Sequence, residues 1–417
     1  MTKERLKKAV SLEVSATHVV ACINQYVFGP IRYSLGLVDW GKTGLESLDK
    51  KIRKILTKNK FRSSKGGIGH LNLSRSLGGR GLHSLHDQEI ISANRLWSIA
   101  KLAIPSIIEE FPENKTIQRL KEKAKVGMDL SGKAEPTSKE ITRALQKEKL
   151  EVIANHMQMQ NKFETAIRNQ EGINLELSRN FLRKITMNKY YEKILFDLKD
   201  QTIPLNQIRA AVHNKNKKNK SPAEAKCRMC GEAEESVEHV LSHCKTLNFT
   251  LHKQRHDAVA KEILRKILAT HGEKFETKWY REAPKSSIAL QGKGLVQYDS
   301  KILTPTRVEH CKPDLTLKLP CGQKVIIEIA IPYDTRVTAK SKEKLDRYLP
   351  LAEQMSLTSG KPVIILPIVI GTLGAVSNIT VESIAKLKKL GVHVNLANLQ
   401  KAAVIGSART AQHVLRS

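Results

Sequence analysis

The chain has 417 residues, of which 71 are basic and 41 acidic, so its formal net charge at pH 7 is +30. At roughly 100 to 200 residues per domain, this length predicts two to four domains, each large enough for its own core. These figures argue against a small secreted all-β scaffold and favour a polyanion as the binding partner.

The apolar segments do not predict a membrane protein. The longest run, 362–376, contains two prolines and two glycines and is shorter than the roughly 20 residues of a bilayer span. Glu13 interrupts the apolar stretch near the N-terminus, so we expect no secretory signal. Three of the six cysteines lie within 18 residues, which indicates metal binding in a reducing compartment. We expect an intracellular protein.

Residues 1–112 are predicted to be helical with a loop-rich middle. Residues 43–46, Thr-Gly-Leu-Glu, have the spacing of a capping box, and apolar residues then recur on one face of a helix. The other faces of that helix are basic, which fits either a solvated surface or a phosphate-contacting one. Glycines between residues 66 and 81 are assigned to turns, because they lack the strand and the Gly-Lys-Ser/Thr ending of a phosphate loop.

Residues 113–208 are predicted to form a helical linker region, broken near Gly132, Pro136 and Ser138. A basic stretch follows and leads directly into the cysteine cluster, so we predict that it tracks a nucleic-acid phosphate backbone. The residues predicted to make these contacts are Arg209, Lys215, Lys217, Lys218 and Lys220.

A cysteine-histidine cluster has the pattern C-x2-C-x8-H-x4-C, formed by Cys227, Cys230, His239 and Cys244. Four ligands of these types suit tetrahedral zinc, with Gly231 allowing the turn after the first pair and a short helix over 236–242 presenting His239. His243 is the rival fourth ligand, and the alternative to a metal site is three buried cysteines with a capping histidine. Because all four positions are protein ligands, the predicted zinc is a structural cofactor of the segment 209–250.

A β-hairpin is predicted from two alternating segments, 314–319 and 324–331, joined by a turn. If the turn is centred on Cys321, Asp314 lies directly across from Glu328. Two carboxylates about 5 Å apart repel each other, so the pair favours a divalent cation, and we predict Mg²⁺ there. The alternatives are a one-residue register slip, which separates the carboxylates, and an ordinary Pro-Asp turn.

A helix is predicted over 338–349, with Lys340 and Lys344 four residues apart on one face. A lysine beside the carboxylates can orient or deprotonate a water molecule and offset charge on the scissile phosphate, although most lysines on such a helix are simply solvated. Residues 362–371 then form a nearly continuous apolar segment, which predicts a buried central strand.

In combination, these features resemble the C-terminal part of non-LTR retrotransposon polyproteins that carry a restriction-like endonuclease of the PD-(D/E)xK type. The likeness covers nearly the whole chain. Residues 48–54 and 78–82 resemble the thumb after the polymerase palm, and the CCHC cluster matches the family's zinc ligands. Residues 312–314 and 327–330 resemble its nuclease strands, Lys344 with Tyr348 resembles its displaced catalytic lysine and following tyrosine, and 399–403 resembles its tail.

The chain departs from the family pattern in three places. Glu328 stands where aspartate is usual, and Ala330 stands where simpler PD-(D/E)xK enzymes keep their lysine. The resemblance therefore requires Lys344, with Lys340 and Lys342 as substitutes. Nothing resembles the Tyr/Phe-x-Asp-Asp palm motif, so no reverse transcriptase activity is expected from the chain alone. It is expected to be a truncated or domesticated element product.

The resemblance implies an α+β chain: a largely helical N-terminal half, a small zinc knuckle, and an α/β restriction-endonuclease-like core with a mixed sheet over 251–417. It implies a nuclease in which Asp314 and Glu328 hold Mg²⁺ and Lys344 assists water. Target DNA would be nicked for target-primed reverse transcription. Arg255, with its neighbours His256 and Asp257, either binds DNA or packs, and Trp279-Tyr280 either stacks on a base or lies in the core.

The implied partners are target DNA, element RNA and a reverse transcriptase acting in trans, with no membrane, in a nuclear or nucleocytoplasmic protein. Two other outcomes remain open. One is a non-catalytic nucleic-acid-binding remnant or domesticated protein with a decayed nuclease core. The other is an inert gene fragment with exposed apolar surface.

Overall fold

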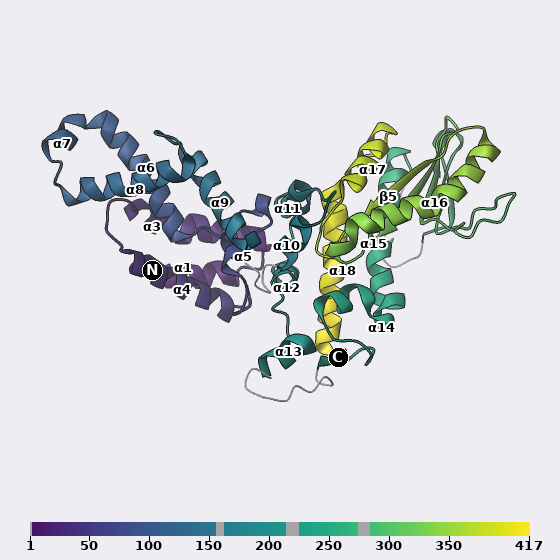
Figure 1. Ribbon diagram of the computed structural model, residues 1–417, viewed down its shortest axis with the longest axis horizontal. Coiled ribbons are helices and arrows are strands. Elements are labelled where there is room, and N and C mark those ends of the chain that lie inside the picture. Colours follow the sequence, from purple (N-terminus) through teal and green to yellow (C-terminus); the bar gives the residue numbers. More distant parts are fainter. Residues whose placement is uncertain (1, 156–161, 214–224, 274–283) are drawn as a thin grey trace. The chain divides into compact units, whose positions relative to one another are not determined.

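A computed structural model describes residues 2–155, 162–213, 225–273 and 284–417 of the chain (Figure 1). It is a mixed α and β structure with one sheet among the described residues, as predicted. In those ranges, no helix has the length and apolar character needed to cross a bilayer.

The chain forms two compact units. Unit 1 consists of Met1–Asn161 and Thr186–Asp197, and unit 2 of Lys162–Ile185 and Leu198–Ser417. The sequence-based boundary at residue 112 falls inside unit 1, and the boundary at 208 falls inside unit 2. The segment predicted as one linker region thus contributes to both units.

The secondary structure elements among the described residues of unit 1 are helices, joined by loops. Its apolar core is built mainly from the first four helices and the start of α6, where residues such as Val19, Phe28 and Leu85 are at most 1% exposed. The helices are α1 (Thr2–Ser11), α2 (Ala16–Cys22), α3 (Gly29–Ser34), α4 (Lys42–Lys58), α5 (Ile68–Asn72), α6 (Leu85–Ala103), α7 (Pro105–Glu110), α8 (Lys115–Ser131) and α9 (Ser138–Asn155), and α12 (Lys189–Lys199) begins in this unit.

The basic amphipathic helix predicted from the sequence is α4. Leu45, Ile52 and Leu56 face the core, and lysines occupy the exposed positions. The predicted capping box is wrong. The helix begins at Lys42, so Thr43 lies within its first turn, and Gly41 takes the N-cap position with φ 59° and no side-chain cap.

The predicted helix breakers between 113 and 155 are confirmed. Gly132 ends α8 in the left-handed conformation with φ 67°, a backbone geometry that favours glycine, and α9 begins at Ser138. Leu120 and Ala124 of α8 pack against Trp97 of α6, so these helices belong to a packed body.

A buried ion cluster fixes the segment Thr186–Asp197 within unit 1. Glu192 is fully buried and accepts two hydrogen bonds from Arg75, at 2.9 and 3.1 Å. Arg80 Nε lies 3.6 Å from the same carboxylate, and its guanidinium stacks over the rings of Phe61 and Phe196. Loop 73–82 is therefore held by a helix more than 100 residues later in the chain.

The chain enters unit 2 through α10 (Lys162–Arg168) and α11 (Leu175–Lys184). The ammonium group of Lys199, at the end of α12, lies 4.4 Å from the ring centre of Phe163 on α10. It also lies 5.5 Å from the ring centre of Phe181 on α11. Burial lowers the pKa of Lys199 to about 8, against the opposing effect of nearby Asp334. The cation–π contacts of Lys199 thus link α10 and α11 to the end of α12.

Unit 2 contains a five-stranded mixed sheet in the order β1-β2-β3-β4-β5. The first four strands are antiparallel, and β5 runs parallel to β4. The apolar segment 362–371 does contain a strand, β5, but the predicted central position is wrong, because β5 pairs with β4 at the end of the sheet order. The strands are β1 (Ser287–Leu290), β2 (Gly294–Tyr298), β3 (Leu315–Lys318), β4 (Lys324–Ala330) and β5 (Ile364–Val369).

Helices cover both faces of the sheet. Alternate residues, such as Leu317, Ile327 and Leu366, form one core with helices α15, α17 and α18. Ile326 and Ile365 point to the other face and pack against α16. Figure 1 shows α16 beside β5 and α15 beside α18. The remaining helices are α13 (Asn206–His213), α14 (Lys245–Leu247), α15 (Lys253–Thr270), α16 (Val337–Ser359), α17 (Asn378–Lys389) and α18 (Leu396–Arg416), with the π-helical turn η6 (His239–His243).

The predicted hairpin register is confirmed. Leu315 pairs with Ile327 and Leu317 pairs with Val325, so the turn is centred on Cys321. Gly322 adopts φ 83° in this turn, a conformation that other residues rarely adopt. The one-residue slip is excluded, and the two apolar faces lie as the alternation predicts.

The helix predicted over 338–349 is longer than expected. It is α16, which extends to Ser359 and contains Pro350. Proline removes a backbone hydrogen bond and normally ends a helix. Here Leu351 and Met355, just beyond the proline, are buried against the sheet, and this tertiary packing sustains the helix.

Candidate active site and metal centre

Asp314 and Glu328 meet at one end of strands β3 and β4. The backbone N–H of Asp314 donates to Glu328 Oε2 at 3.1 Å, and the N–H of Ile329 donates to Asp314 Oδ2 at 2.7 Å. Glu328 is 3% exposed, on the face of the sheet that carries α16. The predicted juxtaposition of the two carboxylates is therefore present.

Of the three lysines considered on α16, Lys344 is the one that reaches the carboxylates. Its ammonium group donates a hydrogen bond to Glu328 Oε1, and both side chains are largely buried. Lys340 instead pairs with Glu343 at 2.7 Å, and Lys342 is exposed. Tyr348, one turn further along, donates its hydroxyl to the carbonyl of Lys312 at 3.1 Å. Helix α16 and the hairpin thus bring Lys344 close to the carboxylates of Asp314 and Glu328, although Asp314 lies 30 positions earlier in the chain.

His256 is a neighbour of this site that pattern reasoning did not place there. Its Nε2 lies 3.2 Å from Asp314 Oδ2, and its Nδ1 lies 3.2 Å from Asp257 Oδ1. Helix α15 brings it to the carboxylate from a position 58 residues earlier. The only sequence signal was its place beside Arg255 and Asp257, which did not reveal the contact with Asp314.

The electrostatics of the group follow from burial and from these contacts. Burial and repulsion by Asp314 raise the pKa of Glu328 above its ordinary value. Burial also opposes ionisation of Asp314, but the hydrogen bond and charge of His256, the N–H of Ile329 and the charge of Lys344 together lower its pKa. Burial disfavours the charged form of His256, yet hydrogen bonds to Asp257 and Asp314 raise its pKa to about 10. Cationic groups therefore balance the buried carboxylates.

Of the four oxygens of the Asp314 and Glu328 carboxylates, Oδ1 of Asp314 is open for a ligand. Among the described residues, none hydrogen-bonds Oδ1 of Asp314, whose side chain is 19% exposed. A hard oxygen ligand on a rigid strand end, beside a second carboxylate, is the donor type that Mg²⁺ accepts. The residues present therefore fit a divalent cation.

The four predicted zinc ligands converge in space. The ligand atoms of Cys227, Cys230, His239 and Cys244 all lie within 4.8 Å of one another. The Sγ atoms of Cys227 and Cys244 are 4.0 Å apart, close to the roughly 3.8 Å of two thiolates on tetrahedral zinc. His243 lies outside this group. The cluster can hold a metal ion such as zinc.

The local backbone explains the convergence. Gly231 closes the turn after the first two cysteines with φ 69°, and the turn η6 presents His239. Glu235 is fully buried and accepts hydrogen bonds from the guanidinium of Arg228 at 2.7 and 2.9 Å. Burial raises the pKa of Cys244 to about 11, so a metal ion would have to displace the proton of this thiol in order to bind it.

The predicted nucleic-acid contacts divide into three groups. Arg209 lies exposed on α13. Lys215, Lys217, Lys218 and Lys220, like Trp279-Tyr280, lie outside the described residues. The prediction for Arg255 is wrong because its side chain is 3% exposed and donates to Leu241 O at 2.7 Å and to Ser407 Oγ at 3.1 Å. Arg255 packs the interior of unit 2, so phosphate cannot reach it.

No family model and no curated protein sequence matches the chain. The functional argument therefore depends on the residues and their geometry.

Proposed function

We propose that unit 2 is a divalent-metal-dependent DNA nuclease of the restriction-like PD-(D/E)xK type, which nicks one strand of its target. The observation that carries the proposal is the convergence of Asp314, Glu328 and Lys344 at one end of a mixed sheet. Two hydrophobic cores hold the sheet between helices, so the site is built on rigid elements. A sheet needs no carboxylate pair for its own stability, since such a pair repels.

The two carboxylates would hold Mg²⁺, which supplies Lewis acidity at the phosphate and lowers the pKa of a nearby water. Asp314 offers its open Oδ1, and Glu328 is fixed by the Asp314 backbone N–H. Lys344 would orient the attacking water and offset charge that develops on the phosphate. The water oxygen bonds to phosphorus as the bond to the 3′ oxygen breaks.

The wider proposal concerns how the nick would be used and what the zinc site would contribute. A free 3′-hydroxyl at the nick would prime reverse transcription, with element RNA as template and a polymerase supplied in trans. Zinc at Cys227, Cys230, His239 and Cys244 would fix the segment that precedes α15, whose His256 contacts Asp314. On this proposal, the chain would be a retrotransposon-derived endonuclease that acts in the nucleus.

The test is nicking of supercoiled plasmid with Mg²⁺, using the full chain and its Asp314→Asn form. Asparagine keeps the size of the side chain and removes the charge that binds the cation. We expect metal-dependent conversion to open circles by the parent chain and at least a roughly 100-fold slower rate in the variant. Equal DNA binding by both forms, with no nicking by either, would instead identify a non-catalytic nucleic-acid-binding remnant.

A further inference from the structure

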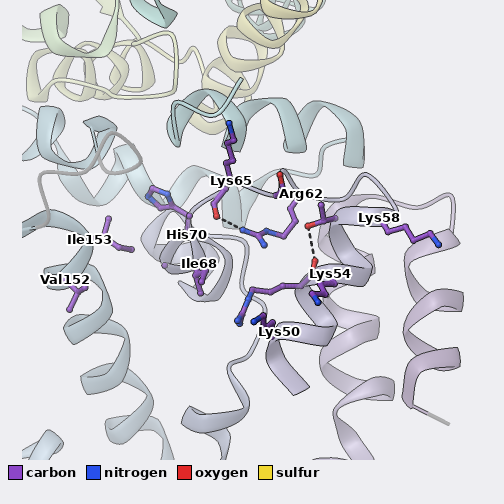
Figure 2. A pocket seen from close by; sticks show the side chains of 15 residues that line it. Lys50, Lys54, Lys58, Arg62, Lys65, Ile68, His70, Val152 and Ile153 are labelled. Carbon is purple, nitrogen blue, oxygen red and sulfur yellow. Dashed lines mark hydrogen bonds between the residues drawn. The ribbon is translucent and has the colours of Figure 1, made fainter. Parts of the chain in front are cut away.

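Unit 1 contains a cation-lined groove that the proposed nuclease does not use. It has a volume of about 970 Å³ and lies between α4, the segment 62–70, which runs into α5, and the end of α9. Figure 2 shows Lys50, Lys54 and Lys58 along one side and Val152 and Ile153 on the other. All the residues that line the groove belong to the described part of unit 1.

The charge of the groove has one sign. Six lysines and arginines line it, and none of the described lining residues is acidic. Lys50, Lys54 and Lys58 are exposed and form no ion pair with any described residue. They follow one another at intervals of four residues, which is about 6 Å of helix rise per step.

Folding alone does not account for this arrangement. Like charges four residues apart destabilise a helix, so an anionic ligand would relieve their repulsion. A regular row of three cations over little more than two helical turns matches a polymer with repeated charges better than a single compact anion.

The uncharged side chains of the groove indicate whether a single strand or a duplex is the better ligand. Ile68 and Val152 are each 52% exposed, and they offer contacts to sugar rings. Grooves that bind single strands usually add aromatic side chains on which bases stack. Among the described lining residues, the one ring is His70, which is 5% exposed. This surface suits the sugar-phosphate exterior of a duplex.

One glycine beside the groove, in the short helix α5, has a packing role. A side chain at Gly69 would meet the terminal carbon of Ile153 at 2.7 Å, so glycine lets α9 approach α5 closely. The guanidinium of Arg62 donates to the carbonyl of Gly66 and holds the turn. The groove is therefore shaped before any ligand binds.

We infer that this groove binds the phosphate backbone of a nucleic-acid duplex, without reading its sequence, at a site separate from the carboxylates of unit 2. Lys50, Lys54 and Lys58 would neutralise successive phosphates. Arg53 adds a further cation from the same helix.

The experiment uses the full chain with Asp314→Ala, so that binding is measured without cleavage. Binding of a short mixed-sequence DNA duplex is followed by fluorescence anisotropy without added Mg²⁺, between about 50 and 200 mM salt. The test variant carries Lys50→Gln, Lys54→Gln and Lys58→Gln. The control carries Lys51→Gln, Lys121→Gln and Lys125→Gln, which removes the same charge from exposed positions of unit 1 outside the groove.

Each phosphate contact contributes about 0.9 to the slope of log affinity against log salt, so the test variant should lose about 2.7 from that slope. The control variant should keep the parent slope, and circular dichroism should show the same helicity in all forms. Equal losses in both variants, or none in the test variant, would overturn the inference. Inorganic phosphate that displaced the duplex at equal phosphate concentration would do the same, since it would indicate a small-anion site. All of these outcomes are read from binding, so none of them depends on nuclease activity.

Discussion

At the scale of single residues, His256 is the least expected member of the site. It bridges Asp257 on its own helix and Asp314 at the strand end, at 3.2 Å to each. A cation placed there holds the Asp314 carboxylate in one orientation through Oδ2 and leaves Oδ1 open. In the proposed nuclease, His256 would therefore be a positioning residue rather than a direct participant in the reaction.

This contact predicts a pH dependence of stability in Mg²⁺-free buffer. The pKa of His256 is raised from 6.5 to about 10 in the folded chain, so its contribution is full below pH 6.5 and is lost as pH rises through 10. The difference in unfolding free energy between the parent and His256→Asn should shrink across this window, by on the order of 2 kcal/mol after solvent screening. Urea unfolding at several pH values measures it. A difference that does not change with pH would contradict the assignment.

At the scale of elements, the Cys₃His cluster should act as a folding staple for the segment from Lys226 to His252. Zinc content is expected to fall from one per chain to near zero in Cys227→Ala, because a structural site needs all four ligands. Hydrogen exchange over this segment should then accelerate. Cys321→Ala, at an exposed cysteine outside the cluster, serves as the control. Full zinc content in Cys227→Ala would exclude the proposed ligand set.

The hairpin and the cysteine cluster could be predicted because their determinants are local. Strand alternation and a turn centred on Cys321 fix which residues face each other, and the C-x2-C pattern fixes its own turn. The continuation of α16 beyond Pro350 could not be predicted, since it depends on burial against a sheet. The contact of His256 with Asp314 and the burial of Arg255 depend on packing between distant segments in the same way.

At the scale of the whole molecule, the chain passes between the two units more than once, so neither is a single stretch of sequence. The predicted boundaries missed this because the return of Thr186–Asp197 to unit 1 leaves no mark in composition. Its anchor is Glu192, which pairs with Arg75 and lies beside Arg80.

Glu192→Gln should therefore destabilise unit 1 by about 3–5 kcal/mol, because it leaves buried arginine charge uncompensated. Glu122→Gln, at an exposed position of α8, should have little effect. Urea unfolding measures the loss of unfolding free energy, and hydrogen exchange shows whether loop 73–82 is the part that loses protection. Equal stability of the two variants would show that the buried cluster is not an anchor.

If Asp314, Glu328 and Lys344 act as one hydrolytic site, as proposed, two lysines one helical turn apart should differ in their effect on nicking. Lys344 contacts Glu328, whereas Lys340 pairs with Glu343 on the same helix. The initial rate of Mg²⁺-dependent plasmid nicking should fall by roughly 100-fold or more in Lys344→Ala and change little in Lys340→Ala. Equal rates in the two variants would contradict the account.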